Sequence, residues 1–302
     1  RELEGVAAIA LAELARGRPE AALNEIQPVR SEIERSGSDN QVALLVQALA
    51  VTNRPGQARE VIGDRPKAQP LWWGEMLRIA SLMPQASIDA RRSWVVEVTE
   101  RADNQNGREV DPAQLAIAWY ELAIVSETAE DLAEAQRRLE AEASRARDTT
   151  TFLRLAVVRE LSGDVASSEQ AYRSALELEP ANPIALNNLA FLLHTQPGRA
   201  REAVELAARA VAVEPGVVSF VDTLGRSQLA AGDAEASLAT FSAGLEDAAD
   251  DPGLILGRVE SLQALDRVED AARALRLLDA RRDLSDEQQD RAERARAALQ
   301  RP

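Results

Sequence analysis

Apolar and polar positions along the chain follow the period of amphipathic helices, and the pattern repeats. The stretches 152–180, 186–215 and 221–246 each read as an amphipathic helix, a turn with Gly and polar residues, and a second amphipathic helix rich in Ala. The first two stretches end in Glu-Pro, and a proline stops a helix because it lacks the N–H and clashes with the preceding turn. The sequence therefore predicts a series of helical hairpins.

The hairpins share one register. Large apolar residues open the first helices at intervals of 33, 34, 35 and 34 residues: Trp119, Phe152, Leu186, Val221 and Ile255. Four residues later stand Ala123, Ala156, Ala190, Gly225 and Val259, and the second helices carry small residues at Ala135, Ser168, Ala203, Ser237 and Ala271. Small residues let antiparallel helices approach closely. One hairpin cannot bury its apolar face alone, so the hairpins are expected to stack.

With this period and these bulky and small positions, the segments resemble tetratricopeptide repeats. The resemblance is strong over 149–247 and weaker over 116–148 and 252–281, where Arg258 and Val259 depart from the usual pattern. It implies an all-α fold, a right-handed α-solenoid of about eight hairpins with a C-terminal capping helix. It also implies that the first helices line a concave face.

The N-terminal third continues the theme less regularly. Helix pairs are expected over 6–29 and 42–62, and a further pair over 72–84 and 88–103. Residues 63–70 are the expected kink, and 104–112 an exposed loop that Asp111 ends by capping the next helix. The expected organisation is degenerate hairpins at 1–67, an irregular hairpin and loop at 68–110, a regular array at 111–283 and a polar cap at 284–302.

Composition narrows the function. The 302 residues include no Cys and one His, which excludes disulfides, a Cys nucleophile and a multi-histidine metal site. A net charge of −15 disfavours nucleic acid, and no apolar run reaches the ~18 residues of a membrane span. The catalytic motifs G-x-x-x-x-G-K, G-x-S-x-G and H-E-x-x-H are absent. We therefore expect a protein that is not an enzyme and has no cofactor.

The source is expected to be bacterial and GC-rich, because Lys67 is the only lysine among 35 basic residues. The chain begins with Arg1, so we expect a fragment of a longer protein. Its compartment stays open between cytoplasm and periplasm.

The resemblance implies that a peptide or helix binds at first-helix positions just after the bulky residue and one turn further on. By register these are Tyr120, Glu121, Ile124, Arg154, Val157, Asn187, Asn188, Phe191, Asp222 and Arg226. Asn188 can donate to and accept from a peptide backbone, while Arg154 and Arg226 could grip carboxylates. The family's two-carboxylate clamp is not expected, because Leu153 and Val157 stand where it needs Lys and Asn. The alternative is that these are ordinary solvated helix residues.

Other single residues allow two interpretations. His194 is expected at a helix end, as a surface or half-buried residue or as a ligand contact. Trp119 is expected in the core. Trp72 and Trp73 are adjacent, so one is expected in the core and the other at a surface that could mark an interaction patch. Alternatives to peptide binding are self-association, through repeat ends or the 63–103 block, and a recruiting arm of a larger secretion, export or enzyme protein.

Overall fold

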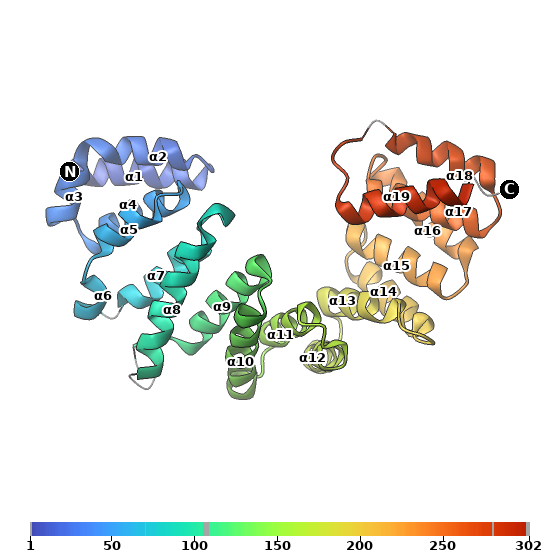
Figure 1. Ribbon diagram of the computed structural model, residues 1–302, viewed down its shortest axis with the longest axis horizontal. Coiled ribbons are helices and arrows are strands. Elements are labelled where there is room, and N and C mark those ends of the chain that lie inside the picture. Colours follow the sequence, from blue (N-terminus) through green and yellow to red (C-terminus); the bar gives the residue numbers. More distant parts are fainter. Residues whose placement is uncertain (1, 70, 105–108, 280, 300–302) are drawn as a thin grey trace. The chain divides into compact units, whose positions relative to one another are not determined.

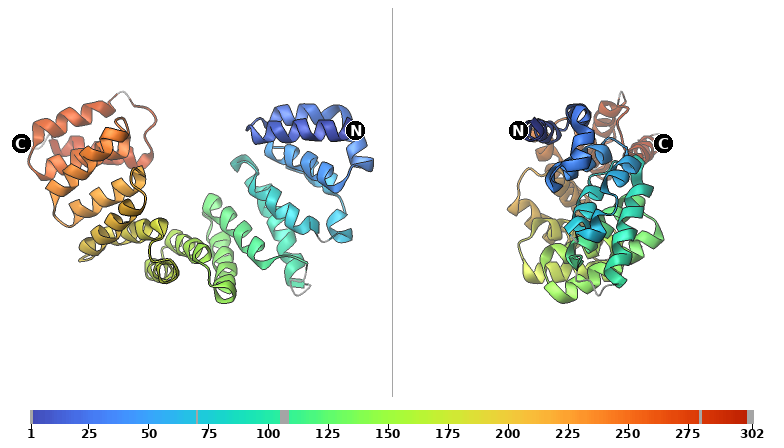
Figure 2. Two further views of the ribbon diagram at one scale, coloured as in Figure 1. Left: turned by 180° about the vertical axis from the view of Figure 1, so that it is seen from behind. Right: turned by 90° about the vertical axis from the view of Figure 1, so that its left-hand side faces the viewer.

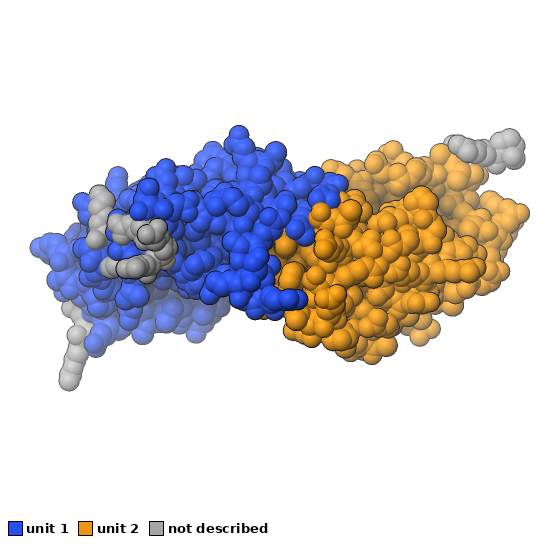
Figure 3. All heavy atoms as spheres, turned by 90° about the horizontal axis from the view of Figure 1, so that it is seen from below, with its two compact units in different colours: residues 1–147, 157–164 blue, residues 148–156, 165–302 orange. Residues whose placement is uncertain are grey.

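The computed structural model describes residues 2–69, 71–104, 109–279 and 281–299, without the side chains of Glu2 and Lys67. All regular secondary structure in these ranges is helical, as shown in Figure 1. The chain separates into two units, coloured in Figure 3. Unit 1 comprises residues 1–147 and 157–164, and unit 2 comprises residues 148–156 and 165–302. The prediction of an all-α helical repeat is confirmed.

The helices of unit 1 are α1 Glu2–Ala15, α2 Pro19–Ile26, α3 Arg30–Ser36, α4 Asp39–Val51, α5 Pro55–Ile62, α6 Arg65–Ala68, α7 Leu71–Ser81, α8 Ile88–Asn104, α9 Pro112–Ser126 and α10 Ala129–Ala146. Hairpin partners are α1/α2, α4/α5, α7/α8 and α9/α10. The first helices also pack on one another, α1 on α4, α4 on α7 and α7 on α9. Figure 2 shows the N-terminal pair α1/α2 against α4 from two further sides. These four first helices share one face of unit 1.

The helices of unit 2 are α12 Val165–Leu178, α13 Pro183–His194, α14 Ala200–Val213, α15 Val218–Ala230, α16 Ala234–Asp247, α17 Pro252–Ala264, α18 Val268–Leu275 and α19 Asp286–Leu299. The helix α11, Thr149–Leu161, contributes its beginning to unit 2 and its end to unit 1. The pairs α13/α14, α15/α16 and α17/α18 form hairpins, and α13, α15, α17 and α19 pack in series. The helix α19 therefore occupies the place of one more first helix.

The small-residue register is confirmed by burial. All ten of these positions, including Val259, are buried, as the spacing predicted. Ser168 Oγ donates a hydrogen bond to the Ala156 carbonyl at 2.9 Å, and Ser237 Oγ donates to Gly225 at 2.8 Å. Each bond joins the small position of a second helix to that of its first helix. Of the bulky positions, Trp119, Leu186 and Ile255 are buried, whereas Phe152 and Val221 are only partly buried.

Local signals in the sequence explain where the helices begin and end. Gly163 and Gly232 have φ of 78° and 84°, the left-handed conformation expected at these turns. Asp111 caps α9 by accepting from the Ala113 amide at 3.0 Å, as predicted. Ser38 and Gln41 form a reciprocal capping box at the start of α4.

The segment 63–70, where a kink is expected, contains the short helix α6, and a short helix α3 precedes the second hairpin. Two expectations are wrong. Trp72 and Trp73 are both buried, at 3% and 4% exposure, because α7 is covered on two sides, so neither marks a surface patch. In the expected exposed loop, Val110 is buried at 4%, and residues 105–108 lie outside the described residues.

Candidate functional site

The predicted contact residues fall on both units. Unit 1 holds Tyr120, Glu121, Ile124 and Val157, and unit 2 holds Arg154, Asn187, Asn188, Phe191, Asp222 and Arg226. Phe191 is 39% exposed, Asn187 is buried at 8%, and the remaining eight are partly exposed.

In unit 2, five of these residues form a cluster on α13 and α15. The Arg226 guanidinium lies 5.3 Å from the centre of the Phe191 ring, a cation–π distance. Arg226 also pairs with Asp222 at 3.5 Å and with Glu287 of α19 at 3.3 Å. Asn187 Nδ2 donates to Asn188 Oδ1 at 3.2 Å. Much of the polar capacity predicted for a ligand is therefore engaged within unit 2.

Two buried acceptors of this cluster have no hydrogen-bond partner among the described residues, Asn187 Oδ1 and Asp222 Oδ1. Burial raises the pKa of Asp222 above its ordinary value, against the opposing attraction of Arg226 and Arg291. The surroundings of Asp222 therefore destabilise its ionised form relative to the protonated form.

His194 ends α13 beside this cluster. It is 8% exposed, its Nδ1 lies 2.6 Å from the Phe191 carbonyl oxygen, and its ring lies 5.2 Å from the Phe191 ring. Burial is the main cause that lowers the pKa of His194, and the nearby Arg226 adds to it. The helix-end position is confirmed, and the neutral imidazole is favoured near pH 7.

In unit 1, Glu121 of α9 pairs with Arg91 of α8 at 3.2 Å. The Arg91 side chain is only 8% exposed, and burial lowers its pKa although Glu121 opposes this. The Glu121 side chain is 35% exposed. The buried Arg91 therefore pairs with a glutamate that is partly open to solvent.

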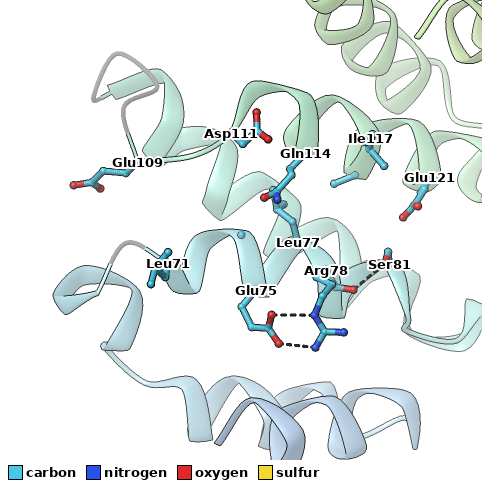
Figure 4. A pocket seen from close by; sticks show the side chains of 12 residues that line it. Leu71, Glu75, Leu77, Arg78, Ser81, Glu109, Asp111, Gln114, Ile117 and Glu121 are labelled. Carbon is cyan, nitrogen blue, oxygen red and sulfur yellow. Dashed lines mark hydrogen bonds and ion pairs between the residues drawn. The ribbon is translucent and has the colours of Figure 1, made fainter. Parts of the chain in front are cut away.

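Beside Glu121 lies a hollow of about 840 Å³ between α7 and α9, which we call the α7/α9 hollow (Figure 4). Its lining residues are Leu71, Gly74, Glu75, Leu77, Arg78, Ser81, Glu109, Asp111, Gln114, Ile117, Ala118 and Glu121. Each of the two helices contributes one stripe of residues at helical spacing. Glu75 and Arg78 face each other across one turn of α7 and form two hydrogen bonds, one of them 2.9 Å.

A second hollow of about 390 Å³, the α1/α4 hollow, shares Glu75 and Arg78 with the first. Its other lining residues are Ala7, Ala8, Leu11, Asn40, Gln41, Ala43, Leu44 and Gln47. Arg78 Nη2 donates to Gln47 Oε1 at 3.0 Å and so links the two hollows. Together they follow all four first helices of unit 1.

Sequence reasoning placed only Glu121 at this site and missed the rest. The missed signal is apolar residues exposed on first helices: Leu71 is 89% exposed and Leu11 is 59% exposed. The residues of α7 have no regular register by which to place contacts. On α9 the register indicates Tyr120, Glu121 and Ile124, and the lining instead includes Gln114, Ile117 and Ala118.

Over the described residues, no group of three or more His, Cys, Asp or Glu side chains is placed to hold a metal ion. None of the described helices is both long and apolar enough to cross a membrane. The hollows thus offer apolar contact, amide groups and carboxylates.

No protein-family profile matches the chain. A 52-residue segment is 40% identical to the photosystem I assembly protein Ycf3 of Cyanophora paradoxa, over 17% of this chain and 30% of that protein's length.

Solved structures are similar over much more of the chain. A tetratricopeptide repeat protein from Parabacteroides merdae aligns with a TM-score of 0.58 at 13% identity, covering 75% of this chain and 93% of that one. A chain of the APC/C hetero-tetramer Cut9–Hcn1 aligns with a TM-score of 0.55 at 15% identity, covering 96% of this chain and 55% of that one. At these identities the likeness concerns the fold. With the phased register and the paired helices, it shows that the chain has the fold of the tetratricopeptide-repeat proteins.

Proposed function

We propose that this chain is a non-catalytic scaffold that binds a polypeptide segment of a partner protein on the first-helix face of unit 1. The observation that carries the proposal is the pair of adjoining hollows along α1, α4, α7 and α9. Binding sites for chains are concave, apolar at the floor and polar at a few defined points.

The physical properties of the hollows support this function. The α7/α9 hollow has the volume of several side chains, and its lining combines Leu77, Ile117 and Ala118 with charged groups at the edge. The lining residues stand almost entirely on helices, which hold side chains more precisely than loops do. The net charge of −15 supports a polypeptide ligand over a nucleic acid.

The test is to close the hollow. A side chain built on Gly74 would enter it, since a Cβ there meets only the Gln114 side chain, with Oε1 at 2.9 Å. We expect peptides selected from a displayed random library against the wild type to lose binding to Gly74→Leu. The matched control is Gly56→Leu on α5, where a Cβ meets nothing within 4 Å. Selected peptides that bind Gly74→Leu as well as the wild type would refute the proposal.

A second candidate surface is the set predicted by register in unit 2. Phe191 is 39% exposed and Asn188 is partly exposed, so an apolar anchor and an amide lie at the surface of α13. The double variant Arg154→Glu/Asn188→Ala tests it against the same peptides. Loss of binding in this variant, with binding retained by Gly74→Leu, would move the site to unit 2.

Self-association is the remaining alternative, favoured by the exposure of Ile9 and Leu11 on α1, at 51% and 59%. Light scattering over a range of concentrations decides it. A mass that stays that of one chain at every concentration argues against a self-assembly module.

A further inference from the structure

We propose that the segment bound in these hollows is basic, with apolar side chains that enter the hollows and Lys or Arg side chains that flank them. This inference rests on the proposed function of the hollows. It adds the chemical class of the partner.

The charge at the opening of the α7/α9 hollow carries the inference. Four carboxylates line it, against one guanidinium, that of Arg78; the four are Glu75, Glu109, Asp111 and Glu121. Glu75 stands on α7, Glu109 and Asp111 precede α9, and Glu121 lies on α9. A cationic side chain lying in the hollow would therefore meet acidic groups on both sides.

Two further arginines lie nearby, Arg91 and Arg101, but neither lines the hollow. Arg91 is 8% exposed behind Glu121, so its guanidinium cannot reach a ligand without leaving its site. Arg101 binds Glu109 at 2.7 Å and lies 5.8 Å from the centre of the buried Trp73 ring. These two arginines orient the carboxylates. Glu121 and Glu109 are each paired with one of these arginines and keep further acceptor sites for a cation of the partner.

Arg78, the one basic lining residue, is engaged as well. It makes two hydrogen bonds to Glu75 and donates to Gln47 Oε1 at 3.0 Å. A carboxylate from a partner would have to displace Glu75 from Arg78 and would then lie among three further carboxylates. Like-charge juxtaposition of this kind disfavours an acidic segment.

The apolar part of the lining sets the other requirement. Leu71 is 89% exposed at the start of α7, and Leu77, Ile117 and Ala118 line the floor. Covering Leu71 and filling the floor needs aliphatic side chains from the partner. A polycation without apolar side chains would pair with the carboxylates but leave the apolar lining exposed to water. An amphipathic basic segment therefore fits the hollow better.

The test uses two synthetic peptides of about 18 residues with the same Leu and Ala positions, one with Lys and the other with Glu at every polar position. Binding is measured by fluorescence anisotropy. We expect the Lys peptide to bind at least about tenfold more tightly than the Glu peptide, because opposite charges attract and like charges repel across the rim. Raising NaCl from about 50 mM to about 500 mM should weaken the Lys peptide, since the rim is exposed.

Variants separate this site from general attraction to an acidic protein. Glu75→Gln/Glu109→Gln removes two rim charges while keeping amide partners for Arg78 and Arg101, and should weaken the Lys peptide by roughly threefold to tenfold. The control, Glu25→Gln/Glu60→Gln, removes the same number of charges from exposed positions on α2 and α5 and should change binding little. Gly74→Leu should abolish binding of the Lys peptide.

The outcomes distinguish the two proposals. Equal or tighter binding of the Glu peptide, lost in Gly74→Leu, would overturn the basic partner and leave the hollow as the site. Equal loss in both charge variants would show that the attraction is general and would also overturn it. If neither peptide depends on Gly74, the inference fails, and the library selection decides the function by itself.

Discussion

A glycine on a first helix has opposite surroundings in the two units. In unit 2, a Cβ on Gly225 would lie 2.5 Å from Phe241 Cζ, and a Cβ on Gly257 would overlap the same ring. The Phe241 side chain is fully buried and fills the space that both glycines leave. In unit 1, Gly74 faces the α7/α9 hollow, and only the Gln114 side chain comes near.

The comparison shows that a small residue on a first helix has a different role in regular and in degenerate repeats. Where the register is kept, as at Gly225 and Ser237, a small residue admits a neighbouring helix or ring, and the space is filled. Where the register is lost, as around Gly74, the same residue type leaves an opening. We infer that the first helices of the degenerate repeats, together with α9, carry the binding surface because their packing is incomplete.

The largest effect should come from adding one methyl group at each glycine. Gly257→Ala forces its Cβ into the Phe241 ring and should lower the free energy of unfolding by about 2–3 kcal/mol. Gly74→Ala meets no such obstacle and should raise it by about 0.5–1 kcal/mol, because Ala favours the helix over Gly. Urea denaturation measures both changes.

Hydrogen exchange assigns each change to a unit, since each repeat contacts only its neighbours. Faster exchange in Gly257→Ala should be confined to α15–α19. A Gly74→Ala protein as unstable as Gly257→Ala would show that α7 and α9 are packed as closely as α15 and α17, which would contradict the comparison.

The sequence predicted the packing far better than the site. Ala123, Ala156 and Ala190 could be placed because burial in a repeat recurs with a fixed period. The hollow beside Gly74 exists because no neighbouring side chain fills that space. The spacing of residues along the sequence does not indicate where such a space is left empty. Leu71 could be read as apolar, yet whether α8, α9 or solvent covers it follows only from the three-dimensional arrangement.

Two aspartates, Asp131 buried and Asp222 partly buried, make the next comparison, because their pKa values shift in opposite directions. In unit 1, burial alone would raise the pKa of Asp131, but hydrogen bonds from Arg92, Ser126 and Thr128 outweigh it, and the pKa lies below its ordinary value. Asp131 accepts from Arg92 Nη2 at 2.6 Å. In unit 2, burial dominates and raises the pKa of Asp222. Ionisation of Asp131 therefore stabilises the fold, and ionisation of Asp222 destabilises it.

Asparagine substitutions test these signs. Asp131→Asn should lower the free energy of unfolding by about 1–3 kcal/mol at pH 7, because Arg92 loses its charged partner. The folded pKa of Asp131 is depressed, so this cost should persist above the unfolded pKa near 3.9 and disappear as pH falls through the folded value.

Asp222→Asn should behave in the opposite way. Its folded pKa is raised, so the wild type loses stability as pH rises from about 3.9 through the folded value, and the variant does not. The variant should be at least as stable as the wild type at pH 7, and its relative stability should decline towards low pH. Urea titrations from about pH 3 to about pH 7 give both profiles; an Asp222→Asn cost at pH 7 as large as that of Asp131→Asn would contradict the assignment.

A buried hydrogen bond between two side chains joins α8 and α9 in the core of unit 1. In unit 2, hydrogen bonds from serine hydroxyls to backbone carbonyls join the paired helices. Trp119 Nε1 donates to Thr99 Oγ1 at 2.8 Å between α9 and α8. Thr99→Val keeps the shape and leaves the indole N–H without its acceptor, so it should cost about 1–2 kcal/mol. Thr99→Ser retains the hydroxyl and should cost less. A Thr99→Val protein as stable as the wild type would contradict this role of the hydrogen bond.

The smallest effect concerns the contact between α15 and α19. Glu287 is 61% exposed and pairs with Arg226 at 3.3 Å, so Glu287→Gln should change the free energy of unfolding by less than about 0.5 kcal/mol. Arg226 keeps Asp222 and the Phe191 ring, and α19 keeps the Arg291–Glu260 pair at 2.9 Å. A loss above about 1 kcal/mol would mean that this exposed pair holds α19 in place. The arrangement of the first helices of unit 2 would then depend on α19. The hollows of unit 1, by contrast, are formed by its own first helices α1, α4, α7 and α9.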